Sequence, residues 1–371
     1  MAVNQKIRVG VNGYGVIGKR VALAVGRQTD MELTGVADIT ADWRLRLAAH
    51  QGIRLYAATA EHLRAMEAAD LKLEGGLEEL VAGCDVVVDC TPKGVGARNA
   101  ETYRVHNRPF VLQGGETHAV AGHSFVAEAN YLEAVSREAT RVVSCNTTSI
   151  VRTLSALKRV GLLRRARGTL LRRATDPWES DRGGIMNTLV PEPDIPSHQG
   201  PDARSVDPDL DVVTMAVKVP ETLGHLHYWS VQMTRNASKD EVLEAFRSSP
   251  RIAPVHTADG LGALNAVKEM MADLGRPHGD LYEVALWTDM LRAQGDELFY
   301  AYMVDNQAIV IPETIDAIRA LAGQTRNAAA SIQQTNISLG IGPFYFLQAA
   351  DDARVIKRGK SIGAGSGAVN D

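Results

Sequence analysis

The chain of 371 residues has few cysteines, few aromatic side chains and no excess of either charge sign. Its cysteines, Cys84, Cys90 and Cys145, form no C-x-x-C pair and have no His-rich spacing beside them, which argues against a disulfide framework and a zinc site. Lys and Arg number 40 and Asp and Glu 44, so no positive field favours nucleic acid or an anionic membrane. We expect small-molecule partners, no metal, no nucleic acid and no membrane.

Long apolar runs are also absent. None approaches the roughly 20 residues of a membrane-spanning helix, and Met1 to Gln5 lead into a strand-like run rather than an apolar signal segment. Reduced thiols suit a reducing compartment. We therefore expect a soluble, cytoplasmic protein that is not exported.

The first 144 residues alternate short apolar runs with helical patterns. The helical patterns lie at 19–26 and 61–69. The runs that resemble buried strands are 7–11, 32–37, 85–90, 109–112 and 141–144. Such alternation predicts an α/β fold whose first domain, residues 1–144, is a doubly wound parallel sheet of the Rossmann type.

A different pattern follows residue 144. A helical stretch at 145–160 precedes three segments that look like antiparallel strands, at 168–173, 210–219 and 227–234, with a long irregular stretch at 175–209. Irregular stretches of this length are usually functional or packed against a neighbour. The remaining expected parts are an α+β catalytic domain with a largely antiparallel sheet at 145–311, a C-terminal helix packing back on the Rossmann domain at 312–341, and a tail at 342–371 that is frayed from 348 onwards.

A glycine-rich loop follows the first predicted strand. Gly13, Gly15 and Gly18 form G-x-G-x-x-G, in which they make a tight turn, admit a pyrophosphate and allow close packing of helix and strand, respectively. The helix start adds free N–H groups. A purely steric turn is the alternative, but the strand, the helix and an acidic residue twenty positions later favour dinucleotide binding.

That acidic residue, Asp38, ends the second apolar run. A carboxylate there accepts hydrogen bonds from ribose hydroxyls and repels a 2′-phosphate, which favours NAD, with NADP as the alternative cofactor. A surface aspartate that starts a turn is the other interpretation.

Cys145 is the candidate nucleophile. It follows an apolar run and precedes Asn-Thr-Thr-Ser, which is rich in helix-capping residues, so we expect the sulfur at a helix start that lowers the thiol pKa. An inert buried cysteine is the alternative interpretation, which suits Cys84 and Cys90 better.

Several strings, in order over residues 6–341, carry a family resemblance: VNGYGVIGKRVA (11–22), QGGE (113–116), VVSCNTTSIVRT (142–153), RRATDP (172–177), IPSH (195–198), ETLGHLH (221–227) and IPETIDAIRA (311–320). Together they closely resemble the archaeal-type, or type II, glyceraldehyde-3-phosphate dehydrogenases. The resemblance implies a homotetramer that binds an aldehyde phosphate and inorganic phosphate.

The resemblance implies that Cys145 is the catalytic thiol and that His225 is the acid/base. From the residues alone, the choice between His225 and His227 stays open. Because they lie two residues apart in a β-like run, we expect them to face opposite sides of the sheet, with only one toward the thiol.

Further site residues follow from the resemblance. The cofactor contacts that it implies are Val16, Ile17, Gly114, Gly115, Arg173 and Asn306. The substrate contacts that it implies are Ser144, Asn146 and His198, with Gln199 beside them. For Arg173 and its neighbour Arg172, ordinary surface charge is the alternative interpretation.

The sequence departs from the family at three of these positions. Gln199 replaces a second histidine and cannot carry positive charge. Asn306 is one methylene shorter than the usual side chain, and Asp38 stands where many members have a lysine. Phosphate affinity or the substrate itself could therefore differ.

The implied chemistry is attack of the Cys145 thiolate on an aldehyde, hydride transfer to NAD(P), and phosphorolysis of the thioester to an acyl phosphate. Two alternatives stay open: a related cysteine-dependent dehydrogenase acting on another aldehyde, and a catalytically silent NAD-binding regulator.

Overall fold

The computed structural model describes residues 5–113 and 115–342. Gly114 and the predicted tail beyond residue 342 therefore lie outside the described residues. The elements up to residue 144 are β1 (Ile7–Asn12), α1 (Val16–Gly26), β2 (Met31–Asp38), α2 (Trp43–His50), β3 (Leu55–Ala57), α3 (Ala60–Ala68), α4 (Leu77–Gly83), β4 (Val86–Asp89), α5 (Val95–Val105), β5 (Phe110–Leu112), α6 (His118–Ala121), β6 (Ser124–Phe125), α7 (Ala127–Asn130), η1 (Tyr131–Ala134) and β7 (Ala139–Val142). The later elements are α8 (Cys145–Arg159), β8 (Leu163–Arg173), η2 (Pro177–Glu179), α9 (Ser180–Gly183), β9 (Val190–Pro191), α10 (Gln199–Arg204), β10 (Val212–Val219), β11 (Gly224–Met233), α11 (Lys239–Arg247), β12 (Ile252–Val255), η3 (Thr257–Asp259), α12 (Leu264–Asp273), η4 (Pro277–Gly279), β13 (Val284–Trp287), β14 (Arg292–Gln294), β15 (Glu297–Asp305), α13 (Val310–Leu321) and α14 (Ala328–Leu339).

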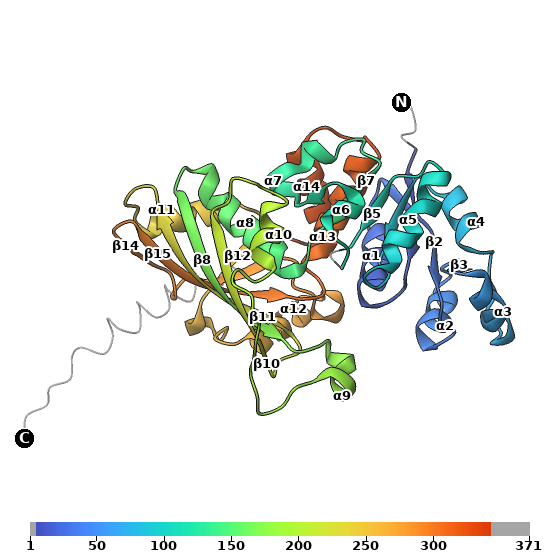
Figure 1. Ribbon diagram of the computed structural model, residues 1–371, viewed down its shortest axis with the longest axis horizontal. Coiled ribbons are helices and arrows are strands. Elements are labelled where there is room, and N and C mark those ends of the chain that lie inside the picture. Colours follow the sequence, from blue (N-terminus) through green and yellow to red (C-terminus); the bar gives the residue numbers. More distant parts are fainter. Residues whose placement is uncertain (1–4, 114, 343–371) are drawn as a thin grey trace, which may run out of the picture.

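The first sheet is parallel throughout, with strand order β3-β2-β1-β4-β5-β7-β6 (Figure 1). Its central strands are buried on both faces, since Val9 and Val11 pack in one core cluster and Val87 and Phe110 in another. Strands covered on both faces form near-continuous apolar runs, which is why the sequence pattern predicts them. The Rossmann-type prediction is confirmed.

The second sheet is mixed, with strand order β12-β13-β15-β11-β8-β10-β9. The pairs of β11 with β8 and with β15 are antiparallel, as predicted. The prediction is wrong for β10, which pairs with β8 in parallel. Parallel neighbours need a long crossover connection, and the irregular residues between β8 and β10 provide it.

Helix α13 connects the two sheets. It begins at Val310, two residues before the predicted start, because Pro312 is tolerated in the first turn, where the N–H groups have no partner within the helix. It contacts α1, β5 and β7, so after β15 of the second sheet the chain returns to the first sheet (Figure 1).

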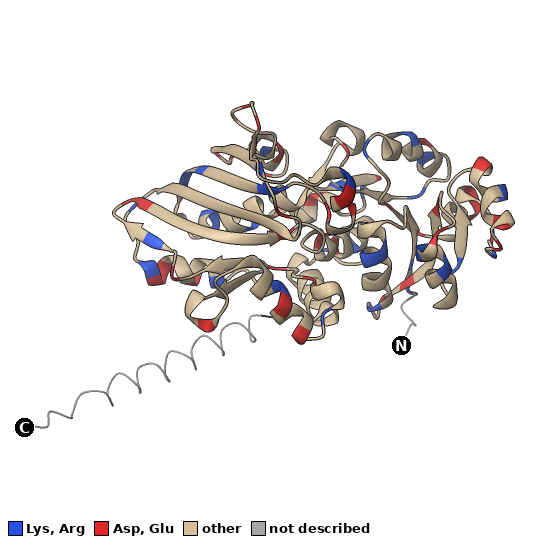
Figure 2. Cartoon of the chain, turned by 90° about the horizontal axis from the view of Figure 1, so that it is seen from below, with Lys and Arg blue, Asp and Glu red and all other residues tan. Residues whose placement is uncertain are grey.

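Charged residues of both signs are interspersed over both sheets and their helices (Figure 2). Many of them form ion pairs, for example Arg20 with Asp280 and Lys158 with Asp207. Within residues 5–113 and 115–342, no helix is both long and apolar enough to cross a membrane.

A buried ion cluster holds α8 against α13. Oε1 of Glu313 in α13 accepts hydrogen bonds from Arg152 in α8, at 3.0 and 2.5 Å, and from Arg251, at 3.0 Å. Its Oε2 accepts from the N–H of Ala127, at 2.6 Å. All three charged side chains are fully buried. Helix α8 carries Cys145 at its first position, so this cluster fixes where the thiol lies.

We predict that Glu313→Gln lowers the free energy of unfolding by about 3–5 kcal/mol, because two buried guanidinium groups lose their shared counter-charge. Denaturant unfolding followed by circular dichroism measures this loss. The Glu313 carboxyl has a lowered folded-state pKa, because the attraction of Arg152 and Arg251 outweighs burial. Its contribution is therefore present above the ordinary pKa of 4.5 and lost as the pH falls.

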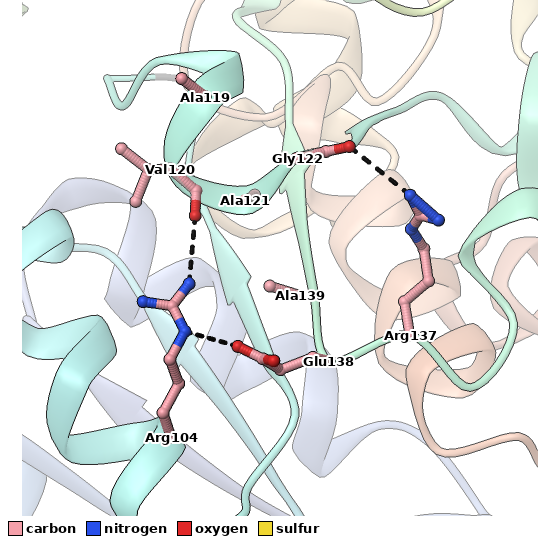
Figure 3. Close-up of a pocket in the computed structure, with 8 residues that line it drawn as sticks. All are labelled: Arg104, Ala119, Val120, Ala121, Gly122, Arg137, Glu138 and Ala139. Carbon is pink, nitrogen blue, oxygen red and sulfur yellow. Dashed lines mark hydrogen bonds and ion pairs between the residues drawn. The ribbon is translucent and has the colours of Figure 1, made fainter.

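Glu138→Gln is the matched control. Glu138 pairs with Arg104 at 2.5 Å on the surface, with both side chains substantially exposed (Figure 3). Surface pairs of this kind contribute about 0–1 kcal/mol. Equal losses from the two variants would contradict the structural role of Glu313.

Candidate active site

The glycine-rich loop joins β1 to α1 beside β4, where the strand order reverses and dinucleotides bind in sheets of this type. Gly13 has φ +92°, and a Cβ on Gly18 would overlap the Gly13 carbonyl oxygen, so both positions require glycine. A Cβ on Gly15 would meet nothing within 4 Å. The open space beside Gly15, at the start of α1 with Val16 and Ile17 in its first turn, fits a pyrophosphate.

Asp38 ends β2, where the sequence predicts it, but its carboxylate is already largely engaged. Oδ1 accepts from the N–H groups of Ile39 and Thr40 and from the Thr40 hydroxyl, at 2.7 to 3.1 Å. Oδ2 accepts from the N–H of Tyr14 at 2.6 Å. An ionised carboxylate retains a free lone pair on Oδ2. Asp38 can therefore accept a ribose hydroxyl while it also holds the glycine-rich loop.

Cys145 is the first residue of α8, as the sequence predicts. Ser144 is the N-cap, and its side chain accepts from the N–H of Thr147 at 3.3 Å. The Sγ of Cys145 lies 3.3 Å from Nε2 of His225 and 3.9 Å from Nδ2 of Asn146. The structure thus brings together three residues that the sequence predicts for one site.

The thiol pKa departs from the sequence-based expectation. Burial raises the pKa of the Cys145 thiol, and Arg173, the Asn146 N–H and Arg172 oppose this effect without reversing it. The helix start lowers the pKa only if the thiolate is also well solvated or strongly paired. In this site burial is the larger influence.

His225 and His227 lie on the same face of β11, and the prediction that they face opposite sides is wrong. Side chains alternate along a strand with a period of two, so residues two apart share a face. His225 contacts Cys145, while Nε2 of His227 lies 2.8 Å from Oδ1 of Asn146. Nδ1 of His227 lies 2.9 Å from the Tyr302 hydroxyl. His227 therefore contacts the neighbour of the thiol rather than the thiol itself.

Arg172 and Arg173, at the end of β8, bring positive charge close to the sulfur. Arg172 pairs with Glu192, and His198 lies 3.6 Å from the same carboxylate with its side chain largely exposed. Gln199, the next residue, is fully buried, and neither polar atom of its amide has a hydrogen-bond partner. A buried amide without partners suits contact with a bound ligand.

Asp176 is a residue that the sequence analysis did not single out. Its Oδ1 accepts from the amide groups of Asn306, at 2.9 Å, and Gln307, at 2.8 Å, and its Oδ2 pairs with Arg173 at 3.3 Å. Oδ1 of Asn306 is buried and has no partner. That oxygen is free to accept a hydrogen bond from a carboxamide such as that of nicotinamide. In the sequence, the only signal that Asp176 lies at this site is its position three residues after Arg173.

The remaining predicted positions and cysteines lie around this site. Gly115 is exposed near the backbone of Lys93. Burial raises the pKa of Cys84 to about 11 and that of Cys90 well above its ordinary value, so neither is a good nucleophile. In the part of the chain that the structure describes, no group of three or more His, Cys, Asp or Glu side chains could hold a metal ion.

One pocket lies away from the thiol. It is lined by residues around Arg104, Val120 and Arg137, at the amino end of β7 (Figure 3). Ligands of open α/β sheets bind at the carboxyl ends of the strands, so this pocket does not belong to the candidate active site.

Comparisons with known proteins agree with this geometry. Residues 144–272 match the family described as glyceraldehyde 3-phosphate dehydrogenase, C-terminal domain. The chain is 44% identical over 342 residues to the glyceraldehyde-3-phosphate dehydrogenase of Metallosphaera sedula, a match that covers 92% of this chain and 100% of the relative. It is 45% identical over 336 residues to the enzyme of the same name from Pyrobaculum calidifontis, a match that covers 90% of this chain and 97% of the relative. It is 42% identical over 336 residues to that from Halobacterium salinarum, a match that covers 90% of this chain and 100% of the relative.

Each of these matches covers at least 90% of the chain. The chain therefore belongs to the glyceraldehyde-3-phosphate dehydrogenase family, in its archaeal type.

Proposed function

We propose that this chain is a phosphorylating glyceraldehyde-3-phosphate dehydrogenase, an NAD(P)-dependent oxidoreductase of glycolysis or gluconeogenesis. The observation that carries the proposal is the 3.3 Å contact between Cys145 and His225 at the start of a buried helix, beside two arginines. The names of the archaeal relatives support the same activity.

Cys145 is the nucleophile of the proposed reaction. Its thiolate attacks the aldehyde carbon, and the resulting oxyanion receives hydrogen bonds from donors at the start of α8 and from the Asn146 amide. Loss of hydride from the thiohemiacetal carbon to a bound nicotinamide would leave the acyl group on Cys145 as a thioester. Inorganic phosphate then attacks the thioester carbon, and the Cys145 thiolate leaves as the acyl phosphate forms. The proposed phosphate ligands are Arg172 and His198, which both lie at the Glu192 carboxylate, and the partnerless amide of Gln199.

The cofactor site fits a nicotinamide dinucleotide, which when bound supplies the hydride acceptor. Gly13, Gly15 and Gly18, with Val16 and Ile17, would hold the pyrophosphate. At the other end, Arg173 and the free Oδ1 of Asn306 would hold the nicotinamide. Gly115 completes this proposed set.

Two groups bear on the choice between NAD and NADP. Asp38 retains one lone pair for a ribose hydroxyl, and its negative charge would repel a 2′-phosphate. Arg20, a cation in α1, is committed to Asp280 at 3.0 Å and is buried. We therefore propose that NAD is preferred and NADP is the poorer cofactor.

Gln199 also favours one alternative, a related dehydrogenase that acts on a different aldehyde. An uncharged amide where the family has a second histidine holds phosphate less strongly than a cation does. A catalytically silent NAD-binding regulator has less support, because such a protein would not need Cys145 and His225 in contact.

The proposed homotetramer has support on the outer face of the second sheet. Met215, Tyr228, Met290 and Phe299 are large apolar side chains that are 38 to 48% exposed there, and they line one continuous hollow. Exposed apolar patches of this kind usually mark an interface. We also propose that the enzyme works in the cytoplasm, where a reducing environment keeps Cys145 as a thiol.

We predict that Cys145→Ser lowers kcat by at least about a thousandfold while NAD binding is retained, because a hydroxyl is not ionised near neutral pH. Stopped-flow kinetics and cofactor titration measure the two properties. Cys84→Ala, a change in the core beneath β4, is the control and should keep nearly full activity. An active Cys145→Ser enzyme would refute the mechanism.

The Gln199→Met variant tests whether the partnerless amide contacts phosphate. A lost hydrogen bond to a charged group is worth about 1.5–3 kcal/mol, so KM for glyceraldehyde 3-phosphate or for phosphate should rise about tenfold or more. Stability should not fall, because the variant removes two buried polar atoms without partners. If both KM values stay unchanged, Gln199 does not contact either anion, and a different aldehyde becomes the better proposal.

For the cofactor, we expect the wild type to have a higher kcat/KM with NAD than with NADP. Asp38→Asn should shift this ratio toward NADP by about tenfold, since it removes a charge facing the 2′-phosphate and keeps one of the two acceptor oxygens. Glu32→Gln, on the exposed part of the same strand, is the control for a general change of charge. A wild type that prefers NADP would contradict the role given to Asp38.

A further inference from the structure

The pocket of Figure 3 adjoins a second hollow at the amino ends of β5 and β7, and we call the two together the β7 groove. Both hollows are lined by Arg104, Arg137 and Glu138, and each has a volume of about 440 Å³. The second hollow is also lined by Arg108. Volumes of this order accommodate small-molecule ligands. Cys145 follows the carboxyl end of β7, so the groove lies at the opposite end of the sheet from the candidate active site.

The β7 groove holds more positive than negative charge. Arg104, Arg108 and Arg137 contribute three guanidinium groups, and Glu138 is the single carboxylate among the described residues that line the groove. Two positive charges are therefore left over, although the whole chain has a net charge of −4. Like charges that are held close together repel each other, and a bound anion would supply the missing negative charge.

Arg104 is held in place with part of its guanidinium unused. Its Nε donates to Oε1 of Glu138 at 2.5 Å, and its Nη2 donates to the Val120 carbonyl oxygen at 3.3 Å (Figure 3). The guanidinium also lies over the Phe110 ring, 5.5 Å from the ring centre. Nη1 has no hydrogen-bond partner in the described part of the chain. A fixed guanidinium with free N–H groups is preorganised for phosphate oxygens.

Arg137 and Arg108 form no ion pair with any described residue. The one hydrogen bond of the Arg137 guanidinium goes to the Gly122 carbonyl oxygen, at 3.5 Å (Figure 3). Nη2 of Arg108 donates to the Ala82 carbonyl oxygen at 3.1 Å, while its Nε is buried and has no partner. Buried donors without partners are uncommon in folded proteins. Both side chains therefore have donors available for a ligand.

The backbone beside Arg137 is strained. Ser136, which lines the second hollow, has φ +59°, a left-handed conformation that serine rarely adopts. Its N–H donates to the carbonyl oxygen of Ala320 in α13 at 2.9 Å, which holds the turn in this form. Residues held in such conformations are concentrated at binding and active sites. The strain therefore supports a role for the groove in binding.

We propose that the β7 groove binds a small molecule that carries two or more linked phosphate groups. Arginine suits this class because its planar fork donates two parallel hydrogen bonds to phosphate oxygens. Three guanidinium groups also offer more N–H donors than a single phosphate can use. Inorganic pyrophosphate and a nucleoside diphosphate share this chemistry. The proposal does not depend on the proposed function, because none of these arginines belongs to the proposed cofactor or substrate contacts.

Isothermal titration calorimetry of the full chain with inorganic pyrophosphate tests this site. Pyrophosphate could also enter the proposed active site, so excess NAD is added and Arg172→Gln is present in every protein compared. We expect one saturable site with a Kd below about 1 mM, which weakens as the salt concentration rises. Absence of saturable binding would overturn the proposal. Calorimetry needs no turnover, so the result stands even if the proposed activity fails.

Variants of opposite charge effect show whether pyrophosphate occupies the groove. Arg137→Gln and Arg108→Gln should each weaken binding about tenfold or more, because a charge-assisted hydrogen bond is lost. Glu138→Gln should tighten binding severalfold, since it removes the carboxylate but keeps an acceptor for Arg104. Arg98→Gln, an exposed arginine of α5 that does not line the groove, is the control and should change the Kd less than about twofold. Equal effects of Arg137→Gln and Arg98→Gln would overturn the proposal.

Two further measurements complete the test. Without ligand, Arg137→Gln should unfold at the same temperature as its parent or higher, because it relieves repulsion and loses only one long hydrogen bond. Adenosine diphosphate in place of pyrophosphate distinguishes the two sources of the diphosphate. Tighter binding that still depends on Arg137 indicates a nucleotide, and equal or weaker binding indicates free pyrophosphate. Binding of both ligands that is independent of Arg137 would contradict the site.

Discussion

The position of the thiol depends on one buried carboxylate, Glu313. It receives hydrogen bonds from Arg152 in α8, from Arg251 and from the Ala127 N–H. Buried ion pairs often contribute little net stability, because desolvation offsets their attraction, but leaving one partner unpaired is costly. The cluster therefore acts mainly by excluding other placements of α8. Since Cys145 is the first residue of α8, the distance from its sulfur to His225 depends on a contact that Arg152 makes about two turns further along the same helix.

A second buried pair relates the cofactor loop to the rest of the site. Arg20 in α1 donates to both oxygens of Asp280, at 3.0 Å, and these residues lie 260 positions apart in the chain. Burial raises the pKa of Asp280 to about 6, against the attraction of Arg20. Helix α1, whose amino end would hold the pyrophosphate in the proposed function, is thus tied to the loop that precedes β13. The glycine-rich loop and the thiol helix are both held by charges that water does not reach.

Burial also determines which side chains of the site carry a charge. Both β11 histidines have lowered pKa values, that of His227 reaching about 3, so neither supplies positive charge near neutral pH. Arg172 and Arg173 supply it instead, because a guanidinium stays protonated even where it is desolvated. The imidazoles are hydrogen-bond partners of Cys145 and Asn146, and the arginines are the groups that would attract an anionic substrate in the proposed function.

Local pattern alone was enough to predict the parallel sheet, the glycine-rich loop and the helix that begins at Cys145. These features depend on neighbours in sequence: apolar runs, a turn that only glycine allows, and polar residues that suit a helix start, although the N-cap itself is Ser144 and not one of the residues after Cys145. The family resemblance added His225, which the spacing could not distinguish from His227. Only the tertiary structure decided which histidine contacts the thiol, the parallel pairing of β8 with β10, the occupied lone pairs of Asp38 and the contacts of Asp176. Each of these depends on groups that are distant in sequence, or on which face of a strand another element covers, and burial reversed the expected shift of the thiol pKa for the same reason. The sequence determined which groups the site has, and packing decided which of their atoms remain free to react.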